Sequence, residues 1–184
     1  AEASFLRALA YYDLVRIFGG VPLVNETPSL ERDLLLPRSS VAEIYAFIKA
    51  ALPTAANGLP LERNFGRATS GAAKSLMASV HLTLREFDPA RDHALEVINS
   101  GVYSLMPDYG DLWVHPTSDN NSESVFEVQY AGCESWGTGN PRQAFFAPWN
   151  QGITKGTDGW GSLVPTDPGQ DNPGTTAADI WEEN

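Results

Sequence analysis

The sequence has little cysteine and few basic residues, and each shortage excludes a class of protein. Its 184 residues include a single cysteine, so an internal disulfide and a multi-cysteine zinc site are both excluded. Twelve lysines and arginines stand against 23 aspartates and glutamates, giving a formal net charge of −11. Such a surface repels polyphosphate, so nucleic acid is excluded as a partner and neutral ligands are compatible. No apolar run approaches the roughly 18 residues that a membrane-spanning helix requires.

Signatures of catalysis and of metal binding are also missing. The three histidines have no metal-ligand spacing, and we expect structural or solvated roles for His81 and His93. Cys133 lacks a nucleophile signature, and residues 156–161 imitate a phosphate loop without the flanking strand and helix. Residues 167–172 offer oxygens for Ca²⁺ but do not match the EF-hand pattern, which favours a solvated turn. We therefore predict no enzyme, no cofactor and no metal, although a hydrolytic carboxylate pair stays open.

Helical periodicity dominates the front of the chain. Residues 2–18 are predicted to form a helix that ends at Gly19 and Gly20. Its apolar residues form two lines, so we expect it to be buried from two sides. The first line is Phe5, Leu9 and Tyr12, and the second is Leu6, Ala10, Leu14 and Ile17.

The second predicted helix covers residues 41–52 and begins at a capping box. Ser40 and Glu43 have the S-x-x-E spacing in which hydroxyl and carboxylate each accept from the other residue's backbone N–H. An apolar face follows at helical spacing and consists of Val41, Ile44, Ile48 and Leu52.

Residues 66–101 are predicted to form a helical hairpin. Thr69 is a suitable N-cap for the first helix, and Asp88 with Pro89 is expected to start the second. Gly101 can adopt the left-handed conformation that ends a helix. The apolar residues lining the two helices are Ala73, Met77, Val80, Leu84, Ala90, Ala94, Val97 and Ile98. A hairpin of about 34 residues has the length of a tetratricopeptide unit.

Beyond Gly101 the helical periodicity stops, and glycine, proline and small polar residues take over. Residues 125–130 are predicted to form a strand, because they are rich in β-branched and aromatic side chains. We draw no regular structure through most of residues 131–176. The predicted fold class is therefore mainly α: tetratricopeptide-like stacked helix hairpins, followed by a loop-rich segment with a few short strands.

Tryptophans gather in the loop-rich half, where they are either packed core or binding surface. We expect Trp113 and Trp149 to pack inside, and Trp136 and Trp160, which have neighbouring glycines, to be exposed. Aromatic planes stack on the C–H faces of sugar rings, and planar amides and carboxylates bind their hydroxyls. The residues predicted to bind ligand are Trp136, Asn140, Arg142, Gln143, Phe145, Trp149, Asp158 and Trp160.

Three stretches together resemble the SusD/RagB family of bacterial surface nutrient-binding lipoproteins. The first is AEASFLRALAYYDLVRIFGGVPL, residues 1–23. The second is PRSSVAEIYAFI, residues 37–48, with GRATSGAAKSLMASVHL, residues 66–82. The third is VINSGVYSL, residues 97–105, with NNSESVFEVQY, residues 120–130. These stretches have the order and spacing of the family, and they carry its scaffold rather than its ligand contacts.

The resemblance implies an architecture and a general role. Residues 1–106 would be the tetratricopeptide-like scaffold, and residues 107–184 the start of a loop-rich ligand-binding region. The family's members are anchored by lipid on the outer face of the outer membrane and cap a SusC-type TonB-dependent transporter. The chain would then be an internal section of such a protein, without the lipidated start, and its membrane association would depend on that anchor.

Two main functions follow from these observations. The first is non-catalytic capture of glycans for import, with the loop aromatics as the contact surface. The alternative is a helical scaffold that binds peptides or proteins, as some relatives in the family take up peptides. The first function predicts that Trp136 and Trp160 are needed for binding, and the alternative predicts that they are dispensable.

Overall fold

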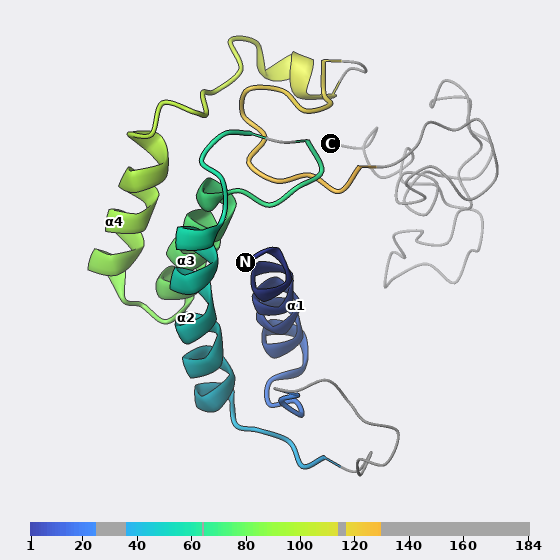
Figure 1. Ribbon diagram of the computed structural model, residues 1–184, viewed down its shortest axis with the longest axis vertical. Coiled ribbons are helices and arrows are strands. Elements are labelled where there is room, and N and C mark those ends of the chain that lie inside the picture. The colour runs from blue at the N-terminus through green and yellow to red at the C-terminus, as the bar shows by residue number, and fades with distance from the viewer. Residues whose placement is uncertain (25–35, 64, 114–116, 130–184) are drawn as a thin grey trace, which may run out of the picture. The chain divides into compact units, whose positions relative to one another are not determined.

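The computed structural model describes residues 1–24, 36–63, 65–113 and 117–129, and in these ranges the regular structure is helical. The elements are α1 (Glu2–Phe18), α2 (Val41–Gly58), α3 (Ser70–Thr83), α4 (Phe87–Ile98) and a short 3-10 helix, η1 (Tyr109–Trp113). Helix α1 packs on α2, and α3 packs on both α2 and α4 (Figure 1). This arrangement confirms the prediction of a mainly α fold built from stacked helix hairpins.

Residues 1–129 form one compact unit, so the segment after α4 belongs with the helices. The predicted division of the chain after residue 106 stays a prediction. In the part of the chain that the structure describes, no helix is both long enough and apolar enough to cross a membrane.

Helix α1 has the predicted bounds but is buried on one side only. Its buried residues are Phe5, Ala8, Tyr11, Tyr12 and Val15. The expectation of burial from two sides is wrong, because Leu6, Ala10, Leu14 and Ile17 are exposed. Helices α2 and α3 cover one face of α1, and none of the other described segments covers the second line.

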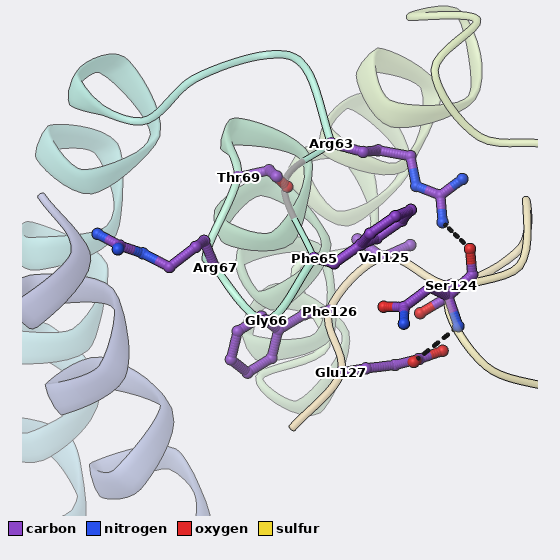
Figure 2. A pocket seen from close by; sticks show the side chains of 10 residues that line it. Arg63, Phe65, Gly66, Arg67, Thr69, Ser124, Val125, Phe126 and Glu127 are labelled. Carbon is purple, nitrogen blue, oxygen red and sulfur yellow. Dashed lines mark hydrogen bonds between the residues drawn. The ribbon is translucent and has the colours of Figure 1, made fainter. Parts of the chain in front are cut away.

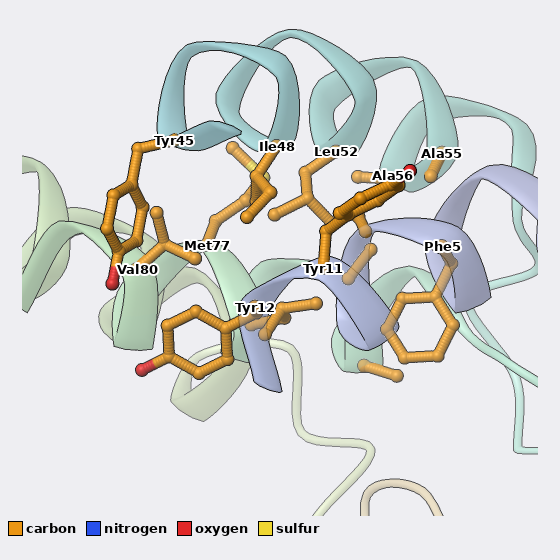
Figure 3. Close-up of a cluster of buried hydrophobic side chains, with 14 of the residues drawn as sticks. Phe5, Tyr11, Tyr12, Tyr45, Ile48, Leu52, Ala55, Ala56, Met77 and Val80 are labelled. Carbon is orange, nitrogen blue, oxygen red and sulfur yellow. The ribbon is translucent and has the colours of Figure 1, made fainter. Parts of the chain in front are cut away.

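The core lies where α1, α2 and α3 meet (Figure 3). Ile44, Ile48 and Leu52 of α2 are fully buried there, as the predicted apolar face requires. Tyr12 of α1 carries a hydroxyl into this packing, and the hydroxyl lies 2.9 Å from Thr83 Oγ1. A buried hydroxyl without a partner is costly, so this hydrogen bond lets the Tyr12 ring fill the core.

Helix α2 begins at the predicted capping box and ends later than predicted. The Ser40 hydroxyl accepts from the Glu43 N–H at 3.3 Å, and Glu43 Oε2 accepts from the Ser40 N–H at 2.8 Å. Glu43 Oε2 also accepts from the Ser40 hydroxyl at 2.8 Å. The hydrogen bonds to the carboxylate, first that from the Ser40 N–H and then that from the Ser40 hydroxyl, lower the pKa of Glu43 because they favour its ionised form. The helix continues through Pro53 to Gly58, because the following turn buries Ala55 and Ala56 against the core. Tertiary packing here outweighs the helix-breaking tendency of proline.

Replacing Ser40 with alanine is expected to lower the free energy of unfolding by about 1 kcal/mol, the usual effect of losing an N-cap hydroxyl. Urea denaturation followed by circular dichroism measures this loss. The matched control is Thr54→Ala, which removes an exposed hydroxyl from the interior of the same helix. Equal effects of the two substitutions would contradict a capping role for Ser40.

The second hairpin confirms one predicted cap and corrects the other. Thr69 caps α3, with its hydroxyl accepting from the Ala72 N–H at 3.1 Å. Asp88 is not the N-cap of α4: the helix begins at Phe87, and Asp88 pairs with Arg91 at 3.0 Å. Pro89 is still accommodated, because the N–H groups of a first helical turn have no intrahelical partner.

The end of α4 differs from the prediction at Ile98 and agrees with it at Gly101. Ile98 was expected to line the hairpin and is instead exposed, whereas Val97 next to it is buried. Gly101 has a φ of +68°, which confirms the expected left-handed conformation after α4. The chain therefore turns away from the helices where the sequence predicts, although the last helical turn presents a different residue to the core.

The strand predicted at residues 125–130 is wrong for residues 125–129, which the structure describes without regular structure. A strand needs a neighbouring strand to pair its backbone, and none lies within the described ranges. Val125 and Phe126 instead both pack on the helical core, and the Phe126 ring meets Phe5 edge-on at 5.2 Å between centroids. Apolar side chains that suggested a strand are used here for side-chain packing alone.

Candidate functional site

The residues predicted to bind ligand all lie outside the part of the chain that the structure describes, so their role stays a prediction. They are Trp136, Asn140, Arg142, Gln143, Phe145, Trp149, Asp158 and Trp160. Within the described residues, two surface features are candidates for ligand binding: a pocket beside the start of α3, and an aromatic turn at η1.

The pocket is a small hollow of about 20 Å³ where two connecting segments meet (Figure 2). The segment before α3 contributes Arg63, Phe65 and Gly66, and the segment after η1 contributes Ser124 and Glu127. Phe65 stands in the pocket with 63% of its surface exposed. The pocket thus brings an aromatic ring, a guanidinium and a carboxylate together from distant parts of the sequence.

Arg63 fastens the two segments to each other. Its Nη2 donates to the carbonyl oxygen of Asn120 at 2.8 Å and also to that of Asn121. The guanidinium carbon lies 5.7 Å from the centre of the Phe65 ring, within range of a cation–π interaction. A charged donor with two carbonyl acceptors is a strong crosslink, so Arg63 serves the structure of this pocket.

The polar groups on the other side of the pocket are also bonded among themselves. The side-chain amides of Asn120 and Gln129 exchange hydrogen bonds of 2.9 and 3.0 Å. Glu127 Oε2 accepts from the Asn120 N–H at 3.0 Å. Gly66, with a φ of +73°, lies so close to Gln129 that a Cβ atom would come within 2.9 Å of its Cγ. These contacts make the pocket a joint between segments rather than a ligand cavity.

The aromatic turn has the opposite character, because its large side chains point to solvent. Tyr109 is 71% exposed and Trp113 is 72% exposed, so the expectation that Trp113 packs inside is wrong. Their ring centroids are 6.0 Å apart with an interplanar angle of 65°. Asp111 and Leu112, between them in sequence, are half-buried. A 3-10 helix has three residues per turn, so the four-residue spacing of Tyr109 and Trp113 does not by itself predict that their rings meet.

Hydrogen bonds hold this turn in shape. Asp108 Oδ1 accepts from the Gly110 N–H at 2.8 Å, and the Thr117 hydroxyl donates to the Asp111 carbonyl at 3.0 Å. An aspartate that bonds the backbone two residues on is a common way to fix a turn. The two rings are therefore carried by a defined backbone.

His81 and His93 lie together at the α3–α4 hairpin. The rings of His81 and His93 stack at 5.5 Å between centroids. Glu86 accepts from Lys49 Nζ at 2.9 Å and lies 2.5 Å from His81 Nδ1. These contacts lower the pKa of Glu86, and the hydrogen bond from Lys49 has the largest effect. The described residues contain no group of three metal-ligating side chains placed to hold an ion.

Comparison with known proteins shows which proteins this chain is similar to. A SusD-like family model, described as starch-binding associating with outer membrane, matches residues 1–82. A SusD-like protein of Bacteroides ovatus is 30% identical over 173 residues, which cover 88% of this chain and 31% of that protein. The chain thus spans about a third of the length of this relative.

Solved structures agree with the sequence matches. A crystal structure containing a xylogluco-oligosaccharide superposes with a TM-score of 0.76 at 30% identity, over 87% of this chain and 34% of that one. A laminarin-binding SusD-like protein superposes with a TM-score of 0.73 at 28% identity, over 81% of this chain and 36% of that one. Both likenesses extend well beyond residues 1–82. The family model over residues 1–82, the relative matched over 88% of this chain and the two superpositions agree with one another, and together they support the assignment of this chain to a SusD-like protein.

Proposed function

We propose that the protein captures oligosaccharides at the cell surface for import and does not hydrolyse them. The observation that carries this proposal is the likeness to two solved relatives, one named as laminarin-binding and one solved with a xylogluco-oligosaccharide. Both ligands are neutral glucans, and neutral ligands are compatible with the net charge of −11 on this chain.

The place of capture is part of the same proposal. The matching family model is described as associating with the outer membrane. We assign the full-length protein to the outer face of that membrane, held by a lipid anchor. Its partner would be a SusC-like TonB-dependent transporter, which takes the captured glycan across. Ligand must pass on to the transporter, so weak binding at each contact suits this role.

The contact residues proposed for the loop-rich half are those predicted from the sequence, with Trp136 and Trp160 as exposed stacking surfaces. Replacing either with alanine is expected to weaken glycan binding by about tenfold, because one stacked aromatic contributes on the order of 1.4 kcal/mol. Affinity electrophoresis through gels that contain laminarin or xyloglucan measures the change in retardation.

The matched control is Trp181→Ala, which removes a tryptophan that is outside the predicted set. It should leave retardation unchanged. Retention of glycan by both Trp136→Ala and Trp160→Ala would contradict the proposed contact surface. Peptide binding without any glycan binding would replace glycan capture by peptide uptake as the function.

A further inference from the structure

We infer that Tyr109 and Trp113 form an additional contact surface for a neutral oligosaccharide, separate in sequence from the predicted contacts at residues 136–160. The inference rests on the proposed function, because it assumes that the protein binds glycans. It assigns a role to residues in the described part of the chain, where the sequence predicted a buried tryptophan.

The exposure of the two rings is the first support. More than two thirds of each side chain is in contact with solvent, although tyrosine and tryptophan contribute most to stability when buried. Their neighbour Leu112 is half-buried. The hydrogen bonds of Asp108 and Thr117 hold the backbone of the turn, and neither involves a ring of Tyr109 or Trp113.

The geometry of the rings is the second support. At 6.0 Å and 65°, the two planes present faces at an angle instead of one flat platform. Successive sugar units along a glycan chain also face different directions, and each has a C–H face that packs on an aromatic plane. The hydrogen bonds of Asp108 and Thr117 fix the turn before any ligand arrives, which reduces the entropy lost on binding.

The charge of the turn selects the class of ligand. Residues 105–113 include two aspartates and no lysine or arginine. Carboxylates accept hydrogen bonds from sugar hydroxyls, but they repel uronic acids, sulfated sugars and nucleic acid. Exposed tyrosine and tryptophan also suit a protein partner, but the two aspartates do not, because aspartate is depleted at the centre of protein interfaces. The occupant that matches both rings and carboxylates is a neutral glycan.

The test uses affinity electrophoresis of the whole chain in laminarin, xyloglucan and the anionic polysaccharide alginate. Trp113→Ala and Tyr109→Ala are each expected to weaken retardation by the two neutral glycans about three- to tenfold. Trp113→Phe should retain most of the binding, because it keeps an aromatic face. The matched control is Leu105→Ala, which removes an aliphatic side chain that is 81% exposed near the same turn.

Each outcome decides the inference. Retardation of the wild type that is unchanged in Trp113→Ala and Tyr109→Ala overturns it while leaving the proposed function intact. A loss in Leu105→Ala as large as in Trp113→Ala also overturns it, since that would indicate a general apolar contact. Equal retardation by alginate overturns the assignment to neutral glycans. If the wild type is not retarded by any glycan, the proposed function and this inference both fail. Circular dichroism of each variant verifies that the helices are intact.

Discussion

Replacing Ile48 with alanine is expected to lower the free energy of unfolding by about 3 kcal/mol, because the substitution leaves a cavity in a packed core. Ile48 has no exposed surface and lies in the core cluster shared by α1, α2 and α3. The removed methyl and methylene groups lose their contacts, and the surrounding helices cannot close the space completely. Urea denaturation followed by circular dichroism gives the free energy directly.

The matched control is Val41→Ala in the first turn of the same helix. The sequence assigned Val41 and Ile48 to one apolar face, but Val41 is 44% exposed. Its truncation should therefore cost less than about 1 kcal/mol. If both substitutions had similar effects, the core would not be where α1, α2 and α3 meet.

Replacing Gly20 with alanine is expected to cost about 1–3 kcal/mol, in the range of other substitutions that add atoms to packed sites. An added Cβ would lie 2.5 Å from the Ser39 carbonyl oxygen, which belongs to the backbone and cannot rotate away. Gly20 and Ser39 face each other because the Ser39 N–H donates to the Val21 carbonyl and Arg38 Nε donates to the Gly20 carbonyl. The substitution must therefore push apart the two ends of the connection between α1 and α2, which meet at Gly20 and Ser39.

Thermal unfolding of Gly20→Ala is compared with that of Gly110→Ala. At Gly110 the nearest atom to an added Cβ is Asp108 Oδ1 at 3.2 Å, the end of a short side chain that can shift. Gly110→Ala is therefore expected to lower the midpoint less. A midpoint for Gly20→Ala equal to that of the wild type would show that the two segments separate without cost.

The sequence predicted the helices well because their signals are local. The capping box at Ser40, the N-cap at Thr69 and the left-handed Gly101 each depend on a few neighbouring residues, and the structure confirms all three. The N-cap expected at Asp88 was a local signal that failed, whereas two other failures depended on partners that are distant in the chain. The second apolar line of α1 includes Ile17, which is exposed because no described segment covers it. Residues 125–129 form no strand, and none of the described residues offers a strand to pair with them.

The candidate site shows the same limit more strongly. A tryptophan in a loop can be core or surface, and composition alone favoured core for Trp113, whereas the structure exposes it. The joint at Arg63 had no sequence signal, because its acceptors are backbone carbonyls that any residue supplies. Glycan binding by residues 136–160 stays a prediction from their aromatic content, and the glycan-binding assays test it.

The bonds from Arg63 to the carbonyls of Asn120 and Asn121 also bear on the order of folding. They join points 57 and 58 residues apart along the chain, whereas α1 with α2, α2 with α3 and α3 with α4 are each joined by a shorter connection. Because the entropy lost on closing a loop grows with its length, nearby helices are expected to associate before the hydrogen bonds of Arg63 form. Residues 117–129 would then dock last, onto a nucleus that the earlier helices have already made.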